Sequence, residues 1–230
     1  MRHATRTLLI LSTIGILAAP APAADLGIEA RPEVERVANP ESGPALRIAR
    51  VTDRRSFSAS AAGRWRPIAF EVDPTDTESL ARIVARTRGS DLGGRGGNVV
   101  LADGATVESL VADVLTQALR RAGYRVLEPG GPGHASAAPV EADVTQFWGS
   151  LREPRSGGGY ASRGSYRFEF RIAVRVLAAI PGLREGQTIA AEGFAARDGR
   201  NAIYWSPALR SALASFDAAV RERVVRPDAR

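Results

Sequence analysis

Residues 106–123, TVESLVADVLTQALRRAG, predict one amphipathic helix with both ends marked. The apolar residues recur at the i, i+3, i+4, i+7 spacing that places them on one stripe of an α-helix. Thr106 is suited to cap the first turn, and Gly123 to take the left-handed position after the last turn. The stripe comprises Val107, Leu110, Val111, Val114, Leu115, Ala118, Leu119 and Ala122. Because such a stripe must be buried, the helix needs a sheet to lie on.

The sheet is visible as alternating apolar and polar residues in several other segments. In 166–176 every even-numbered residue is apolar, and arginines occupy three of the odd positions, which predicts a strand with one buried face. Residues 140–148 alternate in the same way, and the glycines at 157–159 predict an antiparallel hairpin between the two strands. Segments 45–52, 124–127 and 188–196 are predicted as further strands, the last of them continuing a meander.

A second amphipathic helix is predicted from Ser206, as its N-cap, through Pro207 at the first helical position and on to Val224. Residues 77–88 fit either a short helix or a strand, and we favour a short strand at the end of this segment. Two helices and five or six strands, each with one apolar side, predict a two-layer α+β sandwich. The sheet is expected to be mixed or antiparallel, with both helices on one face.

The first 23 residues are typical of a secretory signal. Basic residues precede an apolar run of about 12 residues at 8–19, and Ala21 and Ala23 occupy the small-residue positions of a cleavage site. A retained membrane anchor is the alternative, although a spanning helix needs roughly 20 apolar residues. We expect cleavage near Ala23 or Ala24 and a periplasmic location. Without cysteine the chain is not expected to be a lipoprotein or to form disulfides.

The predicted division of the chain is a signal peptide at 1–23, an extended leader at 24–44, one α+β domain at 45–225 and a tail at 226–230. Prolines and scattered charges without a period indicate the leader. Long loops are expected at 56–76 and 89–98, the second because it is rich in glycine.

Every basic residue of the chain except its two histidines is an arginine, and the formal net charge is +6. A positive net charge favours anionic partners. We expect no nucleic acid, because the chain is predicted to be exported and its arginines are interleaved with acidic residues. An arginine-rich module that binds anionic glycan or lipid headgroups, with peripheral membrane association, is therefore one alternative function.

The sequence offers few catalytic candidates. His134 is the one histidine beyond the signal and lies in a glycine- and proline-rich loop, and no Gly-x-Ser-x-Gly elbow is present. The Gly-rich run at 93–97 lacks the Lys-Ser/Thr of a phosphate loop. Glu141 and Asp143 share a strand face, a spacing that acid/base chemistry can use, but we expect them to pair with Arg167 and Arg171. We predict no enzyme, metal or cofactor; a hydrolase with an unrecognised site is the third alternative.

The order of these features resembles the YajG-like family of bacterial cell-envelope proteins. The resemblance covers roughly 45–224 and rests on the strand that ends in VTDRR at 51–55, the Gly-rich loop, the helix at 106–123 and VEADVTQFW at 140–148. It implies a compact α+β domain akin to the N-terminal domain of TolB, and no catalytic residues. Family members are mostly lipoproteins, whereas this chain has no cysteine to carry a lipid.

These observations together predict a non-catalytic accessory protein of the periplasm or cell envelope. It is expected to bind another envelope protein, or an anionic envelope surface, through an exposed face or edge of its sheet. The candidate partner-binding residues are Arg167, Arg171, Arg175, Glu141 and Asp143.

Overall fold

The computed structural model describes residues 25–29, 36–57, 67, 72–87, 96–152, 166–178, 180, 183–197 and 202–224. These residues form an α+β structure with two mixed sheets, of three and five strands, and three α-helices, so the predicted fold class is confirmed. The predicted signal peptide, the C-terminal tail and the glycines expected at the hairpin tip lie outside the described residues, as does most of the two predicted long loops.

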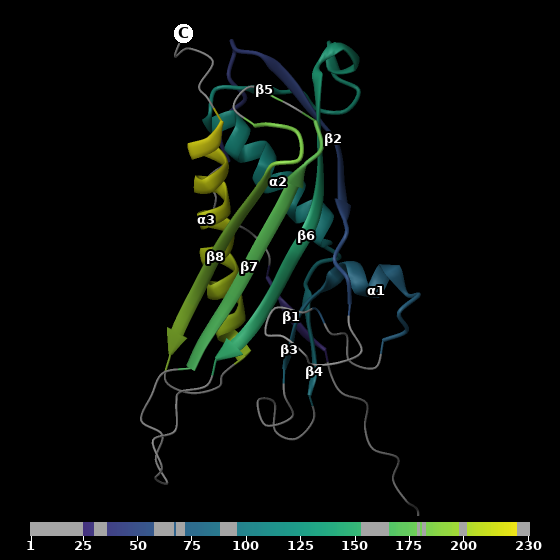
Figure 1. Cartoon of the computed structure of the whole chain (residues 1–230), viewed down its shortest axis with the longest axis vertical. Helices are drawn as coiled ribbons and strands as arrows, with labels where there is room; N and C mark the ends of the chain where they lie inside the picture. The colour runs from purple at the N-terminus through teal and green to yellow at the C-terminus, as the bar shows by residue number, and fades with distance from the viewer. Residues whose placement is uncertain are drawn as a thin grey trace, which may run out of the picture.

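The larger sheet has the strand order β5-β2-β6-β7-β8 (Figure 1). β2 is parallel to both of its neighbours, whereas β6, β7 and β8 form the predicted antiparallel meander. The bounds are β2 Ala45–Asp53, β5 Arg125–Val126, β6 Ala138–Arg152, β7 Tyr166–Val176 and β8 Thr188–Arg197. The large even-numbered side chains of β7 from Phe168 to Val176 are buried, as their alternation predicts.

The smaller sheet has the order β1-β4-β3, with bounds β1 Leu26–Ile28, β3 Ile83–Thr87 and β4 Gly97–Leu101. β1 lies inside the segment 24–44 that is predicted as an extended leader, and it pairs there as a strand of the smaller sheet. It pairs in parallel with β4, and the Asp25 carboxylate accepts hydrogen bonds from the backbone and side-chain nitrogens of Asn98 at 3.3 and 3.2 Å. A three-residue strand is too short to show a period in the sequence.

The ambiguous segment at 77–88 contains both predicted structures. Helix α1 (Thr77–Arg82) is capped by Asp76, whose side chain accepts a hydrogen bond from the Ser79 N–H, and the chain passes directly into β3 at Ile83. The short strand that we favoured at the end of this segment is therefore present, and one turn and a half of helix precedes it.

Helix α2 (Val107–Arg121) is the helix that the opening stretch predicts. Thr106 and Ser109 form a reciprocal capping box, and Gly123 has a φ of 92°, in the left-handed region that favours glycine. The whole predicted stripe is buried: Val107, Leu110, Val111, Val114, Leu115, Ala118, Leu119 and Ala122 are each at most 5% exposed. The stripe packs mainly against β2, β5 and helix α3.

Helix α3 (Trp205–Arg223) begins earlier than predicted. A 3₁₀ turn at Ala202–Tyr204 leads into it, so Ser206 is not the N-cap and Pro207 is the third helical residue. Trp205 explains the shift, because its buried ring packs on Phe168 and Phe170 at centroid distances of 5.0 and 5.7 Å. Proline is tolerated there, since the N–H groups of a first helical turn have no intrahelical partner.

Helices α2 and α3 lie on one face of the larger sheet, as predicted (Figure 1). The contact of α3 with β8 is close: a Cβ atom built on Gly193 would lie 2.0 Å from the backbone nitrogen of Ala212. The smaller sheet joins the same layer, because Ala85 of β3 and the ring of Trp205 both approach Gly149 of β6. The opposite face of the larger sheet, which we call the outer face, is covered by none of the described helices.

Candidate functional site

The outer face is rich in arginine. Strand register and alternation place eight arginines and four acidic residues on it or immediately beside it: Arg47, Arg50, Arg54, Arg125, Arg152, Arg167, Arg171 and Arg175, with Glu141, Asp143, Glu169 and Glu192. Their net charge is +4, whereas the other charged residues of the described part of the chain, 11 arginines and 14 acidic residues, carry a net charge of −3. Positive charge in the described part of the chain is therefore concentrated on this face.

The predicted partner-binding residues are all on the outer face, but the structure does not bring them together as predicted. Glu141 pairs with Arg50, with 2.9 Å between Oε2 and Nη2, and Asp143 pairs with Arg54 at 3.7 Å. The prediction that these acids pair with Arg167 and Arg171 is wrong. In the antiparallel register Asp143 lies opposite Arg175, and Arg167 lies at the other end of β7. Both acids pair with β2 and the residue after it, since β2 lies beside this half of β6.

A cluster of charged residues and one aromatic ring lies at the other end of the outer face, where β6 and β8 end and β7 begins. Arg152 and Arg167 lie directly opposite each other on β6 and β7. Between them, the Glu169 carboxylate lies 2.9 Å from Nε of Arg167 and 3.9 Å from Nε of Arg152. The guanidinium carbon of Arg167 lies 3.7 Å from the centre of the Phe194 ring, a cation–π arrangement. We call these four residues the Arg152–Arg167 cluster.

Burial within this cluster is uneven. The Glu169 side chain is 9% exposed, whereas those of Arg152 and Arg167 are 57% and 42% exposed. Phe194 is 51% exposed and is one of two large exposed apolar residues in the described part of the chain. A buried acid thus holds two guanidinium groups at the surface next to an exposed aromatic ring.

The middle of the outer face is partly covered. Trp148 lies opposite Arg171 but is buried, and the ring of Phe57 meets its ring edge to face at a centroid distance of 6.2 Å. Arg171 itself pairs with Glu192 on β8 at 3.6 Å. The segment that follows β2 therefore closes the centre of this face, and its exposed surface is divided into two ends.

Sequence reasoning missed Arg55, Glu169 and Phe194. Arg55 follows two residues after Asp53, a spacing that puts both side chains on one side of an extended chain, and this signal could have been read. Phe194 could also have been placed, because Ile189 and Ala191 face inward and alternation turns Phe194 outward. No sequence signal distinguishes Glu169 from its neighbours, because its burial depends on arginines of two strands.

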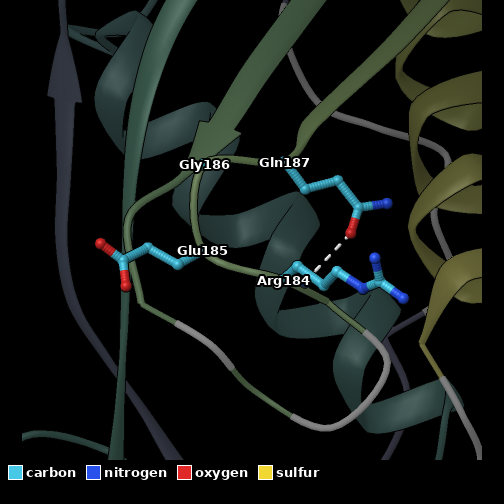
Figure 2. A pocket seen from close by; sticks show the side chains of 4 residues that line it. All are labelled: Arg184, Glu185, Gly186 and Gln187. Atoms are coloured by element: carbon cyan, nitrogen blue, oxygen red, sulfur yellow. Dashed lines mark hydrogen bonds between the residues drawn. The ribbon is translucent and has the colours of Figure 1, made fainter.

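A shallow hollow lies at the turn between β7 and β8 and is lined by residues 184–187. Figure 2 shows the Arg184 and Gln187 side chains on one side of this turn and Glu185 on the other. The Gln187 side-chain oxygen accepts a hydrogen bond from the Arg184 backbone nitrogen at 3.0 Å. Because these side chains diverge, the hollow does not provide the paired acid and base that hydrolysis needs.

The histidine considered as a catalytic candidate, His134, begins a 3₁₀ turn at His134–Ser136. The described ranges contain no group of three or more His, Cys, Asp or Glu residues that could hold a metal ion. The Gly-rich run at 93–97 lies mostly outside the described residues. None of the helices in the described part of the chain is long and apolar enough to cross a membrane.

Comparison with known proteins gives weak matches only. No family model matches the chain, and no curated protein sequence matches it. One solved structure, of an uncharacterised protein, aligns with 78% of this chain and 90% of its own, at 15% identity and a TM-score of 0.35. Another, protein XCC0632 from Xanthomonas campestris, described as a DUF330 family member, aligns with 86% of this chain and 91% of its own, at 9% identity and a TM-score of 0.29. Similarities this low carry no conclusion about family or activity.

Proposed function

We propose that this chain is a non-catalytic accessory protein of the bacterial cell envelope that binds another envelope component through the outer face of its larger sheet. The observation that carries the proposal is the net charge of +4 on a face that the described helices leave uncovered, while the other described residues have a negative net charge. Complementary charge accelerates association and excludes wrong partners, and it contributes little to folding when the charges are exposed.

Two features of the sequence support an envelope location. The first 23 residues have the pattern of a secretory signal, which would deliver the folded domain to the periplasm. The order of elements from β2 to α3 resembles the YajG-like proteins, which belong to the envelope.

The proposal is tested by comparing capture from envelope extract by the wild-type protein and by Arg171→Gln with Arg175→Gln. Arg171 pairs only at 3.6 Å with an exposed acid, and Arg175 is exposed, so neither change should unfold the protein. Arg36→Gln with Arg223→Gln removes the same charge away from this face, because Arg36 is exposed beside α2, where the Val37 N–H donates to Gln117, and Arg223 lies in the last turn of α3. A partner retained equally by all three proteins would contradict the proposal, as would turnover of a defined substrate without any partner.

A second candidate function is binding of anionic glycan or lipid headgroups, favoured by the arginine-only positive charge of the face. The two functions differ in their dependence on salt. Binding that rests on exposed charges alone should weaken steeply with ionic strength, because at 0.15 M salt charges are screened over roughly 8 Å. An envelope protein that also packs on the exposed ring of Phe194 should keep part of its affinity at high salt, so a salt titration of binding to the captured component separates the two.

A further inference from the structure

The Arg152–Arg167 cluster contains two like charges that lie directly opposite each other on neighbouring strands. Two arginines in this position repel, which destabilises a sheet. Glu169 carries a single negative charge and lies close to both, so one positive charge stays uncompensated within the cluster. The arrangement would be completed by a second anion that approaches from the solvent side.

The Arg167 guanidinium group has two contacts that position it before any partner arrives. Its Nε lies 2.9 Å from Oε1 of Glu169, and its carbon lies over the Phe194 ring, 3.7 Å from the ring centre. A side chain held in this way loses little further freedom on binding, which favours affinity. Arginines and aromatic rings are also the residues that dominate the binding energy of protein interfaces.

We propose that the Arg152–Arg167 cluster binds an acidic segment of another protein, with a carboxylate of the segment between the two guanidinium groups and a neighbouring apolar side chain on Phe194. This proposal rests on the proposed function and names the chemistry of its partner. The cluster lies at the end of the sheet where β6 and β8 end and β7 begins (Figure 1).

Charge distribution favours an acidic protein segment over the other occupants of such a face. A second copy of this chain would bring a net charge of +4 against +4. A flat anionic membrane would meet Glu141, Asp143 and Glu192 as well as the arginines, because acids are interleaved along the whole face. A narrow segment can cross the three strands at the cluster and avoid those acids.

The test uses the protein from residue 24 onward and a fluorescein-labelled twelve-residue peptide of alternating glutamate and leucine. Fluorescence anisotropy should show saturable binding that Arg167→Gln weakens by about tenfold or more, since charge-assisted hydrogen bonds are the strong ones at interfaces. Arg152→Gln and Phe194→Ala should each weaken it severalfold. Arg223→Gln, which removes one charge from α3, should leave the affinity unchanged, and a lysine–leucine peptide should not bind.

Glutamine is used in place of glutamate because a carboxylate at position 167 would lie against the buried Glu169. The urea midpoint of each variant shows that it is folded. The proposal is overturned if the acidic peptide does not bind, or if Arg167→Gln and Arg223→Gln bind it equally. It is also overturned if phosphatidylglycerol vesicles bind in an Arg167-dependent manner and the peptide does not.

The proposed function fails separately from this inference. If capture from the extract depends on Arg171 and Arg175 while the affinity for the peptide does not depend on the cluster, the outer face binds a partner of different chemistry. If neither measurement depends on outer-face arginines, both proposals are wrong.

Discussion

Replacing Arg55 by methionine should destabilise the fold by about 3 kcal/mol, near the lower end of the range for breaking a buried ion pair. The Arg55 side chain is fully buried. Its Nε and Nη2 bind the Asp53 carboxylate, Nη1 donates to the carbonyls of Ile83 and Phe147 at 2.7 and 3.1 Å, and Nη2 donates to that of Leu80 at 3.0 Å. One guanidinium group thus joins β2, α1, β3 and β6.

The magnitude follows from what methionine would leave behind. Three backbone carbonyls lose a donor, and Asp53 loses its one charge partner among the described residues, although its side chain keeps 14% exposure and its backbone N–H still donates to Glu108. Because water can reach part of that carboxylate, the loss should not approach the upper limit of about 5 kcal/mol. Adding Asp53→Asn should recover part of the loss, since it removes the uncompensated charge.

Urea unfolding followed by circular dichroism measures the effect, and Arg54→Met is the matched control. Arg54 is 62% exposed and pairs with Asp143 at 3.7 Å, so its replacement should cost about 0–1 kcal/mol. Thermal midpoints should differ by roughly 4–12 °C, because the losses differ by about 2–3 kcal/mol and each kcal/mol shifts the midpoint by about 2–4 °C for a chain of this size. Equal midpoints for the two variants would refute the buried hydrogen-bond network.

Three further predictions concern the core. Gly193→Ala should destabilise the fold by about 3 kcal/mol, because its Cβ atom would lie 2.0 Å from the backbone of α3. Gly27→Ala should be nearly neutral, because the nearest atom to its Cβ atom would lie 3.9 Å away. Urea midpoints check both variants, and equal values would mean that α3 does not pack closely on β8. Leu115→Ala should cost about 2–5 kcal/mol, because Leu115 is 2% exposed, and Thr116→Ala on the half-buried side of α2 should cost much less. Burial raises the pKa of Tyr124 above its ordinary value of 10.0. Because the unfolded state then ionises at a lower pH than the folded state, the free energy of unfolding should fall as pH rises above about 10. The urea midpoint of Tyr124→Phe should fall less than that of the wild-type protein over the same range.

The elements that the sequence predicts are those whose signal is local and repeated. The stripe of α2 recurs over about four turns, and the alternation of β7 runs through eleven residues, so one misplaced residue does not change either prediction. The cap at Thr106 and the turn at Gly123 are equally local. These elements also determine which sheet face is buried, and the outer-face position of Arg167 follows from that.

The features that the sequence does not predict depend on residues far apart in the chain. β1 is defined by its pairing with β4, about 70 residues later, and has no pattern of its own. The partners of Glu141 and Asp143 depend on β2 lying beside β6, and an early start of α3 depends on the rings that surround Trp205. Alternation identifies the face of a residue, whereas register decides which neighbours share it.

Arginine serves two purposes in this chain, and burial distinguishes them. Arg55 inside the fold and Arg121, which binds Asp217 between α2 and α3, have buried acids or carbonyls as partners and hold elements together. Guanidinium groups suit this role because they present several donors in a fixed plane, which an ammonium group cannot do. The outer-face arginines that form ion pairs have side chains that are instead 42–62% exposed, and Arg152 lies directly opposite Arg167. Like charges opposite each other break a rule of strand pairing, and such a violation is expected at a binding site, which is why the Arg152–Arg167 cluster, and not the more numerous arginines beside β2, is the place to look for the partner.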